Sequence, residues 1–192
     1  MTKNPDDYRV TVEVTQAKSD AAIEGFPLVP QQRRLWRLKQ SGRLFLTQMV
    51  LAIEGPLEAN RIANALGMLV QRHEILRTCF MKVAGMSVPL QVIQDAAPVA
   101  LRVVDATEQS EHSIVERLLR ENNSEVFDYT QTPLLRASLV ISSPERQTLI
   151  LALPSLCADT QSLSNLLNEL AALCETSTTG VVEHPRNPRP RS

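Results

Sequence analysis

The sequence predicts a mixed α/β fold, a two-layer sandwich in which helices cover one mixed sheet. Two observations favour this class: helical and strand-like hydrophobic periodicities alternate along most of the chain, and two consecutive strands flank the short turn SSPER. Apolar residues make up 43% of the 192 residues, enough for a substantial core. A chain of this length forms one domain, or one lobe of a larger unit.

The first half of the chain contains a leader, a helix, a strand and a second helix. Residues 1–24 are polar, and YRVTVEV within them alternates as a short strand does, although a flexible leader fits this stretch equally well. Pro30 suits the first turn of a helix. LFLTQMVLAIEG (44–55) is a strand with two apolar faces, which predicts cover on both sides. Residues 57–74 repeat apolar side chains at helical spacing.

The second half contains short strands, a helix, a β-hairpin and a last helix. Strands are expected in ILRTCFMKV, VPLQVI and VALRVVD, followed by a helix over 108–122. LLRASLVI and QTLILALP form the hairpin around SSPER. Asp159 can cap the last helix, which buries an apolar stripe: Leu163, Leu166, Leu167, Leu170 and Cys174. Residues 176–192 lose this periodicity and predict a disordered tail rich in proline and arginine.

Composition argues against several classes of function. The chain has 20 basic and 21 acidic residues, so net charge favours neither nucleic acid nor anionic lipid. It has no run of 18 apolar residues, and its first residues lack the apolar core of a signal peptide. Three cysteines without CxxC spacing (Cys79, Cys157, Cys174) suit buried thiols in a cytoplasmic protein. With only three histidines, no metal site is expected.

Three stretches together resemble the condensation domains of nonribosomal peptide synthetases. PLVPQQRRLWRL (27–38) resembles the opening motif of that family, with Val29 in place of its usual serine. RHEILRTCF (72–80) matches every defined position of the second motif, and VFDYTQTPLLRASL (126–139) resembles a third stretch. The resemblance implies that residues 25–175 form the N-terminal lobe of a two-lobed domain with the chloramphenicol acetyltransferase-like fold. On this comparison, the second lobe would begin where the chain ends.

The turn before the last helix departs from the family. The family motif HHxxxDG falls on residues 154–160, where Pro154 and Ser155 replace both histidines and Thr160 replaces the glycine, while Asp159 is retained. In the family that this chain resembles, the second histidine orients or deprotonates the attacking amine. A serine without an adjacent base cannot take up that proton near pH 7. Condensation by this chain alone is therefore not expected, and no catalytic residue is assigned.

A different chemistry at this turn would need a base beside Ser155 or Cys157. The chain offers three histidines. His184 falls in the predicted tail, His112 lies on a helix among solvated neighbours, and His73 fits a packed, hydrogen-bonded core position better than a catalytic one. A buried Cys157 would behave as a small apolar residue.

The resemblance also implies two structural roles. Asp159 is expected to form an ion pair with Arg77 of the second motif, in addition to capping the last helix. Arg33, Arg34 and Arg37 could dock an acidic carrier protein or its phosphopantetheine arm, although a solvated helix face is the more common explanation of such a pattern.

The first hypothesis for function is a non-catalytic condensation-like lobe that acts as a docking or scaffolding element in nonribosomal peptide biosynthesis. Its partner would be a carrier protein, a neighbouring synthetase domain or a chain that supplies the C-terminal lobe, and self-association stays open. An exposed apolar face would be the physical motive. No cofactor is expected to be bound, and carrier phosphopantetheine would present the substrates. Two alternatives remain: half of an amide-forming acyltransferase, active once completed by a second lobe, and a truncated gene product without function.

Overall fold

The main sheet organises the molecule. The structure, a computed structural model, describes residues 10–13, 22–40 and 45–176. The main sheet has the strand order β3-β8-β7-β6, in which β6 runs parallel to β7 and the other neighbours are antiparallel. Its strands are β3 (Leu46–Glu54), β6 (Leu101–Asp105), β7 (Arg136–Ser143) and β8 (Arg146–Pro154). The mixed α/β class and the β7–β8 hairpin are thus confirmed.

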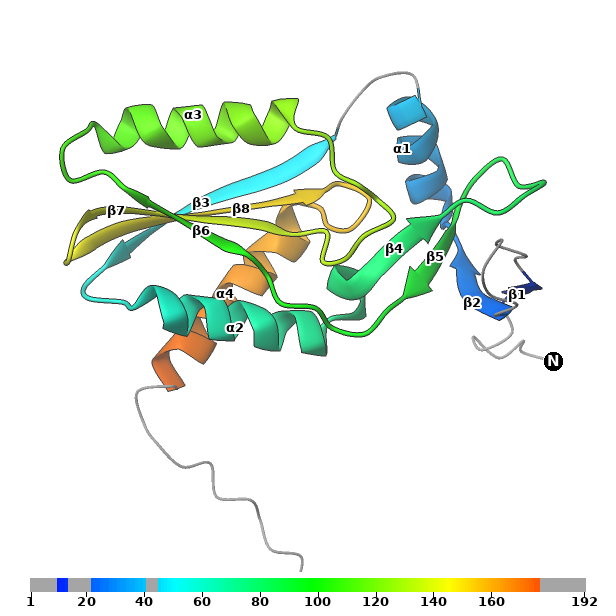
Figure 1. The fold of residues 1–192 in the computed structure, drawn as a ribbon, viewed down its shortest axis with the longest axis horizontal. Helices are drawn as coiled ribbons and strands as arrows, with labels where there is room; N and C mark the ends of the chain where they lie inside the picture. The colour runs from blue at the N-terminus through cyan, green and yellow to red at the C-terminus, as the bar shows by residue number, and fades with distance from the viewer. Residues whose placement is uncertain (1–9, 14–21, 41–44, 177–192) are drawn as a thin grey trace, which may run out of the picture.

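Helices cover both faces of the main sheet (Figure 1). Helices α2 (Ala59–Arg72) and α4 (Thr160–Thr176) pack on one face, and α3 (Glu111–Ser124) packs on the other. Successive strand residues point to opposite faces. Leu139 accordingly joins the core under α2 and α4, and Val140 joins the core under α3. This part of the molecule has three layers, one more than the two-layer sandwich expected.

Strand β8 lies between β3 and β7, and its residues from Gln147 to Pro154 are all buried. Strand β3 is an edge strand. Met49, Leu51 and Ile53 pack against the core, but Val50 on the opposite face is 44% exposed. The predicted cover on both faces of β3 was therefore wrong at Val50. Helix α3 reaches this edge at Gln48, which bonds to Asn122 and Asn123, while its apolar face packs on β7 and β8.

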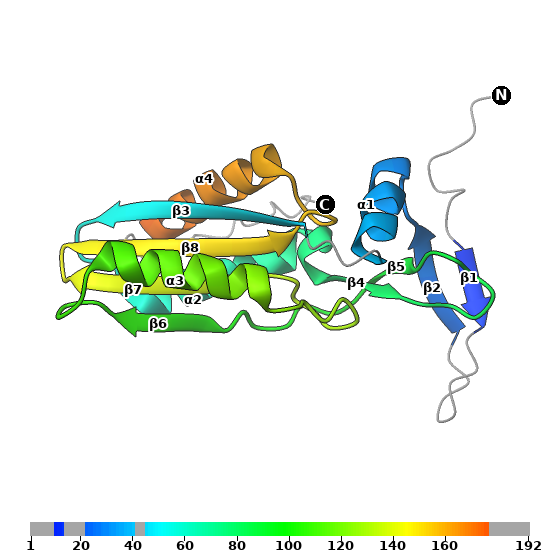
Figure 2. The ribbon, with the colours of Figure 1, turned by 90° about the horizontal axis from the view of Figure 1, so that it is seen from above.

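A second sheet, which we call the side sheet, forms at one end of the main sheet (Figure 2), where the sequence predicted a single sheet. Its order is β1-β2-β5-β4, all antiparallel. The strands are β1 (Val10–Glu13), β2 (Ala22–Pro27), β4 (Thr78–Met81) and β5 (Leu90–Ile93). Strand β1 lies in YRVTVEV, the short strand that the leader allowed. Gly25 lets β2 approach β5, because a Cβ atom there would lie 3.0 Å from Leu90 Cβ.

Helix α1 (Pro30–Gln40) connects the two sheets through an aromatic cluster. Its one buried residue, Trp36, packs against Phe80 of β4 and Tyr129 of the loop before β7.

A 3₁₀ turn, η2 (Glu74–Arg77), leads from α2 into β4. The apolar stripe predicted on α4 is buried as expected.

Two remaining expectations concern the ends of the chain and membranes. The predicted tail, apart from Thr176 at the end of α4, lies outside the described residues, as do residues 1–9 and 14–21 of the leader. In the part of the chain that the structure describes, none of the helices has the length and apolar character that crossing a membrane requires.

Candidate functional site

The turn between β8 and α4 carries the altered motif, and hydrogen bonds fix its backbone. Ser155 N donates to Phe45 O at 2.9 Å, which ties the turn to the residue before β3. Cys157 N donates to Pro154 O at 2.8 Å and closes the turn on itself. Because β8 is the buried central strand and α4 packs beneath it, both ends of the turn are held by the core.

Ser155 makes its side-chain hydrogen bond with Thr47 of β3. The two Oγ atoms are 3.1 Å apart, and Thr47 Oγ1 also donates to Ala158 O at 2.8 Å. A threonine hydroxyl has one proton. Since that proton goes to Ala158 O, Ser155 must donate its own proton to Thr47. The Ser155 hydroxyl thus points its proton at another hydroxyl and at no base, and nothing in this arrangement activates it as a nucleophile.

Cys157 is equally unsuited to nucleophilic chemistry. Its side chain packs against both the main core and the aromatic cluster. Burial raises the pKa of its thiol to about 12. The thiolate, which is the reactive form, is therefore scarce at neutral pH.

Asp159 acts as the N-cap of α4, as the sequence predicted. Its Oδ1 accepts the Ser162 backbone N–H at 2.8 Å, and its carbonyl oxygen accepts Leu163 N at 3.0 Å. Hydrogen bonds from Ser162 hold the pKa of the Asp159 carboxyl below its usual value. The carboxylate therefore stabilises a helix terminus as an ionised acceptor.

The expected ion pair between Arg77 and Asp159 is not formed in the described structure. Arg77 Nη1 donates to Gln94 O at 3.0 Å, and Nη2 lies 3.3 Å from the Glu74 carboxylate. Arg77 ends the 3₁₀ turn beside β5, so the carbonyl after β5 and the carboxylate one turn back are its nearest acceptors. The capping bond already orients Asp159 toward α4.

Gln32 contacts the turn from α1, and the sequence reasoning did not single it out. Gln32 Nε2 donates to Leu156 O at 3.1 Å and to Gln91 Oε1 at 2.9 Å, while Gln32 Oε1 accepts Val29 N at 3.1 Å. One amide thus joins α1, β5 and the turn. Its place in the motif PQQRRLW could have indicated this role, because an uncharged polar side chain beside packed residues of a motif needs hydrogen-bond partners.

The structure describes two histidines, and neither of them contacts a residue of the turn. His73 Nε2 lies 2.7 Å from Glu169 Oε2, and Arg72 pairs with the same carboxylate, so α2 and α4 are bridged. His73 is hydrogen-bonded, as the sequence predicted. Its side chain is 33% exposed, however, so the predicted core position was wrong. His112 is exposed and faces Glu116 on α3. His184 lies outside the described residues.

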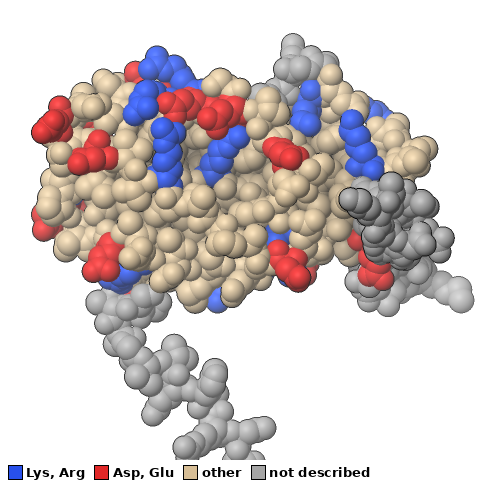
Figure 3. All heavy atoms as spheres, in the orientation of Figure 1, with Lys and Arg blue, Asp and Glu red and all other residues tan. Residues whose placement is uncertain are grey.

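The three arginines of α1 are all exposed. Arg33 Nε donates to Leu28 O at 2.7 Å and so has a structural role at the start of the helix. Arg34 and Arg37 extend along the same helix. Over α3, basic and acidic side chains are interspersed (Figure 3), in line with ion pairs such as Arg117–Glu121. Among the candidate arginines, Arg34 and Arg37 are therefore the ones suited to contact a partner.

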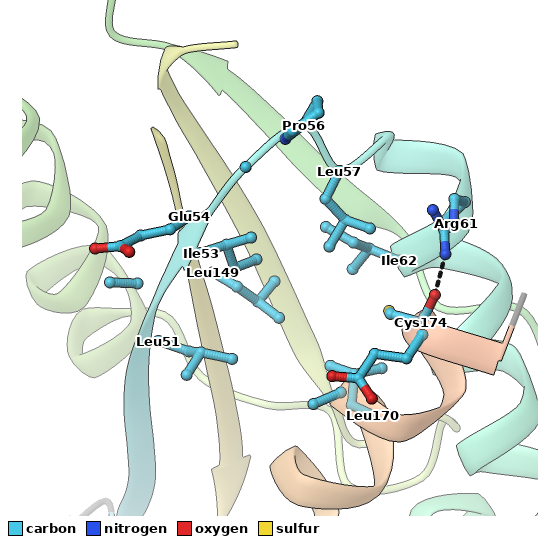
Figure 4. Close-up of a pocket in the computed structure, with 14 residues that line it drawn as sticks. Leu51, Ile53, Glu54, Pro56, Leu57, Arg61, Ile62, Leu149, Leu170 and Cys174 are labelled. Carbon is cyan, nitrogen blue, oxygen red and sulfur yellow. Dashed lines mark hydrogen bonds between the residues drawn. The ribbon is translucent and has the colours of Figure 1, made fainter. Parts of the chain in front are cut away.

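Two cavities adjoin the core at opposite ends of β3. The first, about 460 Å³, lies beside the turn and includes Thr47, Ser155 and Asp159 in its lining. The second, about 440 Å³, lies between the end of β3, the start of α2 and the end of α4 (Figure 4). Its walls are mainly apolar, and Arg61 spans it to donate to the Cys174 carbonyl.

The large apolar face that would require a partner is not evident among the described residues. The exposed large apolar residues lie singly on different elements: Val29, Val50, Met68, Met86, Val103 and Val126. Scattered residues of this kind are normal on a protein surface. Within the same described ranges, groups of histidine, cysteine, aspartate and glutamate that could hold a metal ion are also absent.

Comparison with known proteins identifies the family. The family model described as Condensation domain matches residues 23–188. Tyrocidine synthase 2 of Brevibacillus parabrevis is 34% identical over 171 residues, which is 84% of this chain and 5% of that synthase. Surfactin synthase subunit 2 of Bacillus subtilis is 34% identical over 151 residues, or 77% of this chain and 4% of that subunit. The chain thus spans a small part of the curated relatives that it matches.

Solved structures agree with the family match. The X-domain from teicoplanin biosynthesis is 29% identical with a TM-score of 0.70, over 84% of this chain and 34% of that one. The first condensation domain of the calcium-dependent antibiotic synthetase has a TM-score of 0.71 at 19% identity, over 79% of this chain and 39% of that one, and this likeness shows the fold. The motifs, the fold and the family match agree: the chain belongs to the condensation domain family of nonribosomal peptide synthetases.

Proposed function

We propose that this condensation-type lobe docks and positions partner proteins in nonribosomal peptide assembly and does not supply acid–base catalysis. The hydrogen bonding of the turn at 154–160 carries the proposal. Ser155 donates to Thr47, Asp159 caps α4, and the pKa of Cys157 is about 12. Each of these three groups therefore has a structural partner or an unreactive protonation state.

The partners we propose are a carrier protein or a neighbouring synthetase domain. The X-domain of teicoplanin biosynthesis, 29% identical to this chain, has been solved in a complex with OxyB, which supports partner docking by a domain of this kind. Arg34 and Arg37 on the exposed side of α1 offer positive charge to an acidic partner.

The test combines binding and catalysis in one set of samples. The chain is titrated with a carrier protein in its apo, holo and aminoacyl forms, and association is measured by calorimetry. The same chain is mixed with a condensation-type C-terminal lobe and two loaded carriers, and peptidyl thioester is measured by mass spectrometry. We expect association without product above the level of the carriers alone. Product that depends on the chain and is lost in Ser155→Ala would contradict the proposal.

A second candidate is scaffolded amide formation, in which a completed domain aligns two thioesters without a base. The cavity beside the turn, about 460 Å³ and lined by Thr47, Ser155 and Asp159, favours it because alignment alone can lower a barrier substantially. Product that persists in Ser155→Ala, in the reconstitution above, would favour this candidate over docking alone.

A further inference from the structure

A third cavity, of about 650 Å³, lies between α1, β4 and the loop before β7. Trp36 and Lys39 contribute from α1, Phe80 from β4, and residues 127–131 from the loop. It shares no lining residue with the cavity beside the turn. Its size is typical of a site for a small organic ligand.

The inner wall of this cavity is aromatic and firmly packed. The rings of Trp36 and Phe80 stack with centroids 6.2 Å apart, and both meet Tyr129 edge-on at 5.8 Å and 6.0 Å. Phe80 N donates to Tyr129 O at 2.7 Å, which fixes the loop against β4. These contacts leave a wall whose shape is set before any ligand binds.

Two ammonium groups line the same cavity, against one carboxylate. Lys39 Nζ lies 4.5 Å from the Trp36 ring centroid and 4.0 Å from that of Tyr129. Burial and then the charge of Lys82 lower the pKa of Lys39, although Asp128 acts in the opposite direction. Asp128 Oδ1 accepts both the backbone N–H and the hydroxyl of Thr130. Positive charge therefore exceeds the negative charge available to balance it.

We propose that this cavity binds a small organic carboxylate. The carboxylate lies between the Lys39 and Lys82 ammonium groups, and the apolar part of the ligand packs against the aromatic wall. The two lysine ammonium groups and the Asp128 carboxylate leave a net charge of +1 in the cavity, which a monoanion neutralises. On binding, Lys39 exchanges part of its contact with the two ring faces for a charge-assisted hydrogen bond.

The single tryptophan makes the cavity directly observable, because Trp36 is the one tryptophan of the chain. The probe is sodium hexanoate, titrated against the whole chain while Trp36 emission is followed; hexanamide is its neutral counterpart, and inorganic phosphate is an anion without an apolar part. We expect a saturable change with hexanoate and about 10-fold weaker binding of hexanamide. A response that fails to saturate, equal binding of hexanamide, or equal binding of phosphate would overturn the assignment.

Variants localise the binding. Lys39→Met and Lys82→Met each remove one ammonium and keep an apolar stem, and each is expected to weaken hexanoate binding about 10-fold. Arg120→Met, on the exposed side of α3, removes the same charge away from the cavity and is expected to bind as the parent does. Calorimetry replaces fluorescence for Lys39→Met, because that ammonium contacts Trp36 itself. Since Lys82 is exposed, its variant folds even if Lys39→Met does not, and unchanged affinity in Lys82→Met sinks the proposal.

Discussion

The hydroxyl of Ser155 lies 3.1 Å from the hydroxyl of Thr47, and the Thr47 hydroxyl donates in turn to Ala158 O at 2.8 Å. The residue that stands where the family has its second histidine therefore belongs to a structural chain that joins β3 to the turn. Thr47, at 9% exposure, is the buried member of that chain.

Thr47→Val should lower the free energy of unfolding by about 1–3 kcal/mol, because the buried Ala158 carbonyl loses its donor. Ser155→Ala should cost less, about 1 kcal/mol, since it leaves the Thr47–Ala158 bond in place. Urea unfolding of both single variants and the double variant measures the coupling between the two hydroxyls. Equal costs for the two single changes would refute a chain in which Ser155 donates to Thr47 and Thr47 donates to Ala158.

The roles assigned to Asp159 and Arg77 predict independent effects. Asp159→Ala should reduce stability by removing the cap of α4, whereas Asp159→Asn should retain most of it, because asparagine caps helices about as well. Combining Asp159→Ala with Arg77→Met should give additive losses, since Arg77 bonds to Gln94 and Glu74 instead. A large coupling energy in denaturant unfolding would restore the ion pair implied by the family.

The bridge between α2 and α4 predicts a dependence of stability on pH. Hydrogen bonds and charge from His73, and then from Arg72, lower the pKa of Glu169. A carboxylate with a lowered pKa stabilises the fold above its unfolded pKa, about 4.3, and that contribution is lost as pH falls through the folded value. Glu169→Gln should therefore be less stable than the parent at pH 6, and the gap should close toward pH 3.

Chemical unfolding at several pH values measures this gap. Glu108→Gln, an exposed position on the loop before α3, is the matched control and should follow the parent throughout. A constant difference between Glu169→Gln and the parent from pH 6 to pH 3 would mean that the carboxylate contributes through packing alone.

The thiols should resist alkylation in the folded chain. Burial raises the pKa of Cys157 to about 12 and also raises the pKa values of Cys79 and Cys174. Since the thiolate is the reacting form, iodoacetamide at pH 7.5 should modify native protein much more slowly than protein unfolded in urea. Mass spectrometry of peptides reports each site, and rapid labelling of Cys157 in the native protein would contradict the packing of this partly buried residue between the two clusters.

Docking through α1 predicts a salt-dependent loss. Arg34→Glu combined with Arg37→Glu should weaken association with an acidic carrier protein about 10-fold at low ionic strength, and less at high salt, where such charges are screened. Arg120→Glu on α3 changes charge by the same amount per residue and should have little effect. Calorimetry at two salt concentrations makes the comparison. Unchanged affinity in the α1 variant would move the docking surface away from this helix.

Much of the local structure was predictable because periodicity reports which side of an element is buried. Two strand-like stretches around the turn SSPER predicted the hairpin of β7 and β8, and the stripe on α4 predicted its buried face. The position of Asp159 before that stripe predicted its cap. Each of these features depends on residues close in sequence, whose relative geometry a helix or a strand fixes.

The separation of β4 and β5 into a side sheet was not predictable in this way. Backbone donors and acceptors are the same in every strand, so alternation does not say which strand pairs with which. The pairing depends on close approach, as at Gly25 beside Leu90, and on the aromatic cluster that connects α1 to both sheets.

The amino-acid sequence by itself determined the family motifs, the order of the helices and of the strands other than β2, and the loss of both histidines at residues 154–160. Only the tertiary structure decided what the remaining side chains do: Ser155 bonds to Thr47, Gln32 reaches the turn, and Arg77 turns to Gln94. The physical reason is the short range of a hydrogen bond. A polar side chain bonds to whichever acceptor the fold brings within about 3 Å, and that neighbour comes from a distant part of the chain.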